Sequence, residues 1–119
     1  MKNVYVVNVN KDVLRILFTD SVVNNVDTDQ RVTVCGIREG ETNKSYTYWG
    51  VTIQNPNDVD NPPRGRQVAF RHAFVALAKA KGFNALKNDG SNFNVYPRIK
   101  DLYDVLRRQL FNQGAWNNK

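Results

Sequence analysis

The stretch PPRGRQVAFRHAFVALAKAKGF, residues 62–83, decides the fold of this chain. From about residue 66 to residue 81 its apolar residues recur every three or four positions, as on one face of an amphipathic helix, and Gly82 follows as a suitable C-cap. That face gathers Phe70, Ala73, Phe74, Leu77 and Ala80. The alanines permit close approach, so the sequence predicts a helix that packs on a sheet through this face.

Most of the residues before this helix have the composition of β-strands. Residues 4–9 and 31–38 are rich in β-branched side chains, and residues 46–54 are predicted to be the second arm of a hairpin. Residues 13–18 fit either a returning strand or one helical turn. The asparagines and aspartates of residues 20–30 predict a loop.

The residues after the first helix predict a second one. Pro97 suits a first helical turn, and residues 98–111 follow it with apolar residues at helical spacing. Residues 84–96 are predicted to be a polar loop. The tail, residues 112–119, is expected to fray unless Trp116 packs against the core.

Together these elements predict one α+β domain over residues 1–119. Residues 1–54 are expected to form an antiparallel sheet of three to four strands, and residues 55–65 connect it to two C-terminal helices packed against it. The single Cys35 cannot form an internal disulfide, which fits a reducing compartment. No apolar run approaches the ~18 residues of a membrane span, and the N-terminus lacks a signal peptide's apolar block. We therefore expect a cytoplasmic location and no membrane partner.

The net charge of +6 is distributed unevenly. Residues 1–54 carry six basic and six acidic side chains, so their charges cancel. Residues 64–81 contribute five basic side chains and no acid, and residues 98–119 contribute five basic and two acidic ones. The excess lies after residue 63, which points to a polyanion or an acidic partner.

The sharpest basic feature is Arg64-Gly65-Arg66, placed before the predicted helix. The first amides of a helix lack partners and its dipole favours negative charge there, while a glycine allows close backbone approach. Arginines on either side add bidentate forks for phosphate. The alternative is that Asp58 or Asp60 folds back and neutralises these arginines.

Further binding residues are predicted on the helix surfaces and on one strand. Arg71 and Lys79 share the polar arc of the first helix with Val68 and Val75, a mixture that suits an interface, and Arg107 extends the cationic surface onto the second helix. If the helices cover the Trp49 side of residues 46–54, Tyr46 and Tyr48 are exposed and can stack bases or anchor a protein. The alternative for the tyrosines is cross-strand packing.

The groups needed for catalysis are sparse. His72 is the one histidine, so a Ser-His-Asp triad or a histidine-rich metal site cannot be built, and Cys35 is expected to be buried and inert. Glycine-rich phosphate loops are absent from the sequence. The acid pairs at residues 27–29 and 58–60 lie in asparagine-rich segments, where acids commonly form turns. We expect no enzyme activity, no metal and no cofactor.

The order of a hairpin, the connector NPNDVDNPP and the helix RGRQVAFRHAFVALAKA resembles small bacteriophage accessory proteins over residues 31–81. The resemblance implies a phage or mobile-element origin and an accessory role in the cytoplasm of an infected bacterium. Two functions remain open. The first is non-enzymatic binding of DNA or RNA through the basic helix start and helix face. The second is inhibition or modulation of a host enzyme or defence complex by protein–protein contact, with an acidic host surface as partner.

Overall fold

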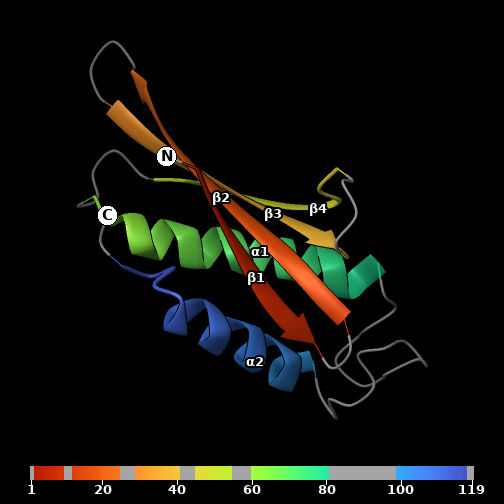
Figure 1. The fold of residues 1–119 in the computed structure, drawn as a ribbon. Helices are drawn as coiled ribbons and strands as arrows, with labels where there is room; N and C mark the ends of the chain where they lie inside the picture. The colour runs from red at the N-terminus through yellow and green to blue at the C-terminus, as the bar shows by residue number, and fades with distance from the viewer. Residues whose placement is uncertain are drawn as a thin grey trace.

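The computed structural model describes residues 2–9, 12–24, 29–40, 45–54, 60–80 and 99–117. Four strands come first in the chain, namely β1 (Lys2–Val9), β2 (Asp12–Asn24), β3 (Asp29–Glu39) and β4 (Tyr48–Ile53). Two helices follow, α1 (Pro62–Ala80) and α2 (Ile99–Asn112). The predicted α+β class is confirmed: an antiparallel sheet in the N-terminal half packs against two C-terminal helices (Figure 1).

The sheet is a meander in the order β1-β2-β3-β4, with every neighbouring pair antiparallel. Residues 13–18, which fitted strand or helix, are strand. The predicted loop over residues 20–30 is wrong for residues 20–24 and 29–30, because β2 and β3 stay paired up to Asn24 and Asp29. Cross-strand pairing holds these residues in the ladder despite their turn-forming composition, and residues 25–28 lie outside the described residues. Figure 1 shows the hairpin projecting beyond the helices.

The two helices cover one face of the sheet, called here the inner face. On β2, Leu14, Ile16 and Phe18 point inward and are fully or almost fully buried. They meet Phe70 and Leu77 of α1, while α2 contributes a line of leucines to the same core. Burial of a side chain of this size stabilises a fold by about 1.5–3 kcal/mol, so the core is large enough to hold the layers together.

Gly50 permits α1 to lie directly on β4. A Cβ atom at this position would come within 2.5 Å of the Ala73 nitrogen and closer still to the Ala69 carbonyl oxygen. Ala69 and Ala73 are themselves fully buried. The alanine face predicted for the first helix therefore meets a glycine, and both sides of the contact are small.

The first helix begins four residues earlier than the sequence predicted, at Pro62 rather than near Arg66. Asn61 is its N-cap: its side-chain oxygen accepts a hydrogen bond from the Arg64 amide at 3.2 Å, and its carbonyl accepts one from the Gly65 amide at 3.1 Å. Pro62 and Pro63 fill the first two helical positions, where a missing N–H costs nothing.

The second helix ends in a glycine cap. Gly114 has a φ of 83°, and the Ala115 amide donates to the Leu110 carbonyl at 2.9 Å, as in a Schellman motif. The turn directs Trp116 back onto Phe18 and Phe70, with ring centroids 5.8 and 6.3 Å apart. The tail was expected to fray unless Trp116 packed against the core. Trp116 does pack there.

Several sequence predictions lie outside the described residues, namely the Gly82 cap, the loop at 84–96, Asp58 and the acid at position 27. Within the described parts of the chain, no helix has the length and apolar character needed to cross a membrane.

Candidate nucleic-acid interface

The start of α1 has no spare amide for a phosphate. Its first two helical residues are prolines, and the next two amides, those of Arg64 and Gly65, already donate to Asn61. The prediction that unpartnered N–H groups hold an anion here is therefore wrong. Gly65 also has another role: a Cβ atom would lie 3.0 Å from Oγ1 of Thr33, so its lack of a side chain lets α1 approach β3.

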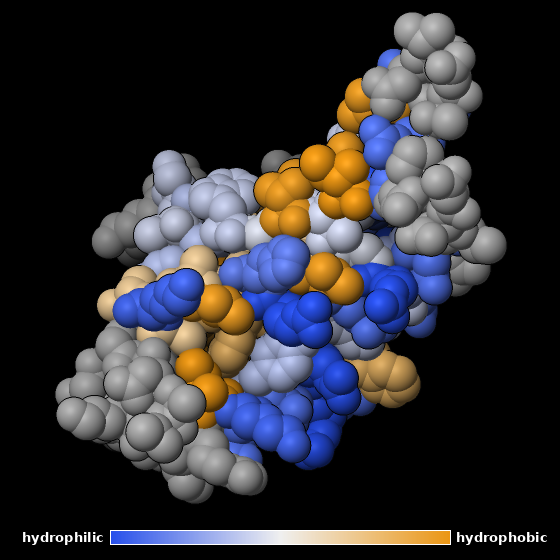
Figure 2. Space-filling model, turned by 180° about the vertical axis from the view of Figure 1, so that it is seen from behind, coloured by the Kyte–Doolittle hydropathy of each residue, from blue (hydrophilic) through white to orange (hydrophobic). Residues whose placement is uncertain are grey.

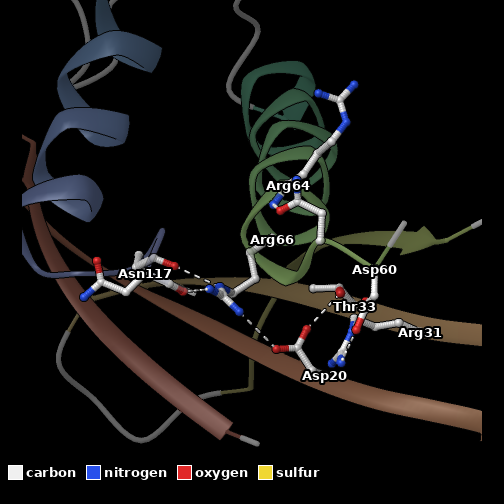
Figure 3. Close-up of polar contacts among 9 residues, drawn as sticks. Asp20, Arg31, Thr33, Asp60, Arg64, Arg66 and Asn117 are labelled. Atoms are coloured by element: carbon white, nitrogen blue, oxygen red, sulfur yellow. Dashed lines mark hydrogen bonds and ion pairs between the residues drawn. The ribbon is translucent and has the colours of Figure 1, made fainter. Parts of the chain in front are cut away.

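Arg66 is a structural residue, which corrects its prediction as a phosphate ligand. It is 3% exposed, and its Nε donates to the Ala115 carbonyl at 2.8 Å. One terminal nitrogen lies 3.3 Å from the Asp20 carboxylate, and the other donates to the Asn117 carbonyl. Figure 3 shows the side chain directed into this cluster, between the sheet and the C-terminal segment. Arg66 thus anchors the segment after α2 to β2.

Arg64 has the opposite environment although it lies two residues away. Its side chain is exposed, and in Figure 3 it points away from Asp20 and Asp60. Asp60, proposed as a neutralising acid, binds Arg31 instead, at 2.8 and 3.0 Å. The hydrogen bond from Arg31 holds the pKa of Asp60 below its usual range. Among the described carboxylates none is paired with Arg64, which leaves its guanidinium open to an external anion on this part of the structure.

The strand tyrosines are arranged differently from the prediction, because the helices cover the Tyr48 side of β4 and leave the Trp49 side open. Tyr48 donates to the Glu39 carboxylate at 3.0 Å, and burial, followed by this contact, raises its pKa to about 12. Trp49 is 47% exposed. Tyr46 is half-buried against Trp49, with ring centroids 5.9 Å apart. Neither tyrosine is a freely exposed stacking platform.

The exposed side of α1 carries a line of basic and apolar residues. Arg64, Val68, Arg71, Val75 and Lys79 follow one another at three- or four-residue spacing, so they share one stripe of the helix. The arginines at 64 and 71 and Lys79 are exposed, Val75 is 43% exposed and Val68 is half-buried. The cations span about 22 Å along the axis. The predicted basic face of the first helix is thus a continuous strip on the surface.

An open groove of about 870 Å³ lies between α1 and α2 beside this strip. We call it the cationic groove. Its walls are Gln67, Lys100, Tyr103, Asp104, Arg107, Arg108, Phe111 and Trp116. Three of these residues are basic and one is acidic, and three are aromatic. A groove with this lining offers positive charge and ring surfaces side by side.

Tyr103 is a half-buried residue in the lining of the groove. Its ring stacks on Phe70, with centroids 5.6 Å apart and the planes inclined by 20°. Burial raises the pKa of its hydroxyl, while the positive charges of Arg107 and Arg71 act to lower it. Arg71 of the α1 strip and Arg107 of α2 therefore both lie near Tyr103, although they are far apart in sequence, and of the two Arg107 lines the groove.

Part of this groove, including Lys100, Arg108 and Phe111 of the second helix, was not predicted from the sequence. Lys100, Arg107 and Phe111 recur at spacings that place them on one side of α2, and Phe111 is 67% exposed. A large apolar side chain on the polar side of an amphipathic helix was the available signal. Seen from behind in Figure 2, hydrophilic side chains dominate the lower part of the molecule, where α2 lies, and hydrophobic groups gather above it.

The reactive side chains lie away from this groove. Cys35 is fully buried, and burial raises the pKa of its thiol. Nδ1 of His72 lies 3.2 Å from the Val51 carbonyl oxygen, so the ring is held against the free edge of β4. Within the described residues no cluster of three histidine, cysteine or carboxylate side chains forms a metal site.

No protein-family model, curated protein or solved structure matches this chain significantly. The resemblance to phage accessory proteins stays a prediction, and function must be inferred from the geometry itself.

Proposed function

We propose that this protein binds single-stranded nucleic acid in the cationic groove, without catalysis. The supporting observation is that Arg107 and the exposed Phe111 line one groove together with Tyr103 and Trp116, and that Arg71 lies near Tyr103. Arginines bind phosphate oxygens through paired donors. Exposed rings stack on unpaired bases, which a duplex keeps hidden.

The α1 strip extends this surface beyond the groove. Arg64 and Lys79 lie on either side of Arg71, at about 10 and 12 Å along the helix. A nucleic-acid single strand of several nucleotides that lies along α1 contacts Arg64, Arg71 and Lys79 one after another. This arrangement favours a backbone-tracking mode with little base readout, as in proteins that bind single strands without sequence preference.

The alternative function, contact with a host protein through Val68 and Val75, has weaker support on this surface. Val68 is half-buried, and each valine lies between two cations of the strip. Such a surface matches a polyanion better than an apolar partner, because a docked apolar surface would have to desolvate the flanking charges.

Fluorescence anisotropy with a labelled single strand of about 20 nucleotides tests the proposal. Each neutralised phosphate of a single strand contributes about −0.7 to the slope of log K against log salt. The double change Arg71→Gln with Arg107→Gln should therefore reduce the slope by about 1.4. Phe111→Ala should weaken binding by about fivefold or more, since one base stack contributes about 1–3 kcal/mol.

The matched control is Arg15→Gln with Arg38→Gln, which removes the same charge from the opposite face of the sheet. It should leave the slope unchanged. Lack of binding at about 50 mM salt would exclude the function. Equal slopes for the two double variants would exclude the groove as the site.

A further inference from the structure

The two edges of the sheet have different neighbours. On β1, the Gln109 side chain exchanges two 2.8 Å hydrogen bonds with the backbone of Asn8, and Gln113 donates to the Val6 carbonyl at 2.7 Å. These glutamines take the place of a neighbouring strand, so they close this edge around residues 6–8. The opposite edge of the sheet is β4.

The free edge of β4 presents backbone groups from alternate residues. The Gln54 amide donates to a β3 carbonyl at 2.9 Å, and this orientation alternates along an antiparallel strand. Trp49, Val51 and Ile53 therefore turn their N–H and C=O groups away from β3. In agreement, the Val51 carbonyl faces Nδ1 of His72, 3.2 Å away, and within the described parts of the chain this is the one contact of these backbone groups. A carbonyl oxygen has two acceptor sites, so Val51 can still accept a bond from an added strand.

The side chains of the same three residues form an apolar row on the face of the sheet opposite the helices, called here the outer face. Trp49, Val51 and Ile53 are 47, 47 and 61% exposed. Val34 and Val32 of β3 lie opposite Val51 and Ile53 and are half-buried beside them. Charged side chains and prolines commonly protect an edge strand from pairing, and β4 contains neither.

A second copy of the chain does not fit this edge. Neighbouring strands lie about 4.8 Å apart, whereas the axes of two packed helices lie about 8–10 Å apart. α1 lies directly over Gly50, where a Cβ atom would meet the backbone of Ala69 and Ala73. Pairing of β4 with β4 of another copy would therefore make the two α1 helices overlap. A bare extended segment brings no helix and avoids this overlap.

The exposed side of α1, which lies over β4, determines which charges a partner can carry. Arg64, Arg71 and Lys79 are exposed on this helix, and residues 62–80 contain no aspartate or glutamate. Like charges brought together in an interface are unfavourable, and opposite charges favour association. A segment with acidic residues is therefore attracted to this edge, and a basic segment is repelled.

We propose that the free edge of β4 binds an extended segment of a partner protein, which pairs with Trp49, Val51 and Ile53 as an additional strand. The segment is about six residues long, as is usual for a strand, and carries apolar residues at alternate positions beside the exposed row. Its remaining positions carry acidic rather than basic residues. Nucleic acid does not supply the regularly spaced N–H and C=O groups that strand pairing requires. The proposal does not depend on nucleic-acid binding in the cationic groove.

Selection of random peptides of about six residues, displayed on phage, against the whole protein supplies defined probes. The expected winners alternate β-branched or aromatic residues with aspartate or glutamate. Synthetic winners should bind Val51→Pro at least about tenfold more weakly than the unchanged protein, a difference of about 1.4 kcal/mol. The proline removes an N–H that the sheet itself does not use, and edge strands tolerate proline at such positions.

Val4→Pro is the matched control. Val4 is 46% exposed, and its amide points to the outer edge of β1, because Val6 and Asn8 turn their backbones toward the glutamines on that side. The winners should bind this variant as they bind the unchanged protein. Thermal unfolding confirms that both proline variants are folded.

A second measurement needs no variant of the protein. Two versions of each winner are made, with N-methyl groups on one or the other set of alternate amides. Only alternate amides of a strand face its neighbour, so one version should lose binding and the other should retain it.

The proposal is wrong if the selection yields no winners or basic winners, if both proline variants bind the winners equally, or if both N-methylated versions bind alike. A dimer in sedimentation that Val51→Pro dissociates would identify a second copy as the occupant. Loss of single-strand binding in Val51→Pro would assign the edge to nucleic acid. Absence of single-strand binding by the unchanged protein would contradict the function of the cationic groove alone.

Discussion

The inner and outer faces of the sheet carry similar β-branched residues but have different surroundings. On the inner face Val7, Ile16 and Ile37 are completely buried under the helices. On the outer face Val4, Val51 and Ile53 remain in contact with solvent. Apolar character therefore does not select the covered face here. The small residues do, because Gly50 lets α1 approach the backbone of β4, whereas Trp49 projects from the other side.

The same difference separates the two arginines at the start of α1. At about 100° per residue, positions 64 and 66 lie on nearly opposite sides of the helix. Arg66 points inward and is held by Asp20 and two carbonyls, while Arg64 points outward. A double charge reversal at 64 and 66 would place a carboxylate beside Asp20 and unfold the protein. Binding and stability must therefore be tested with single changes.

The largest effect is expected for Arg66→Ala. It removes the Arg66 guanidinium from the Asp20 carboxylate, whose side chain is 10% exposed, and loss of one partner of a buried pair costs about 3–5 kcal/mol. Arg64→Ala is the matched control, and a surface change of this kind should alter the free energy of unfolding by less than about 0.5 kcal/mol. Urea denaturation measures both. Similar losses in the free energy of unfolding for Arg66→Ala and Arg64→Ala would contradict a structural role for Arg66 alone.

Adding one methyl group to each face, through Gly50→Ala and Gly36→Ala, compares how tightly the two faces of the sheet are packed. Gly50→Ala should destabilise the protein by about 1–3 kcal/mol or more, because the Cβ atom meets the backbone of α1. Gly36→Ala should cost about 1 kcal/mol or less, because the exposed Trp49 ring can rotate away. Thermal unfolding of the two variants gives the order. A larger loss for Gly36→Ala would show that the outer face is packed as tightly as the inner one.

The smallest effect is a pH dependence arising from Tyr48 on the inner face. Burial raises its pKa to about 12, above the ordinary value of 10.0, so the fold favours the neutral phenol. The stability it contributes is complete below pH 10 and is lost as the pH rises from about 10 toward 12. In urea midpoints measured across this range, the unchanged protein should lose more stability than Tyr48→Phe. Parallel decline of the two curves would mean that Tyr48 is not the group responsible.

The parts of the fold that could be predicted from the sequence are those set by local pattern. The apolar spacing of α1 and α2 and the β-branched strands follow from residues adjacent in the chain, and they yield the α+β class. The start of α1 was misplaced although Asn61-Pro62-Pro63 carries an N-cap followed by prolines at the first helical positions. A helix that begins at Pro62 places Arg64 and Arg66 on opposite sides, so that only one of the two arginines can face solvent.

The candidate site was predicted in part. Arg71, Lys79 and Arg107 were identified from charge alone, and the structure leaves all three exposed. The groove lined by Gln67 of α1 and Arg107 of α2 requires the packing of two helices separated by 18 residues, which no local pattern records. The burial of Arg66 likewise depends on Asp20, which lies 46 positions away.

By itself, the sequence determined the class of fold, the location of the excess positive charge and the faces of the two helices, because each depends on the spacing of neighbouring residues. Only the tertiary structure decided which side of β4 is covered, which arginine is buried and which cations share a groove. These features depend on how closely two backbones approach and on partners far apart in the chain. The physical reason is steric: a glycine at position 50 and alanines at 69 and 73 fit together only after the layers have met.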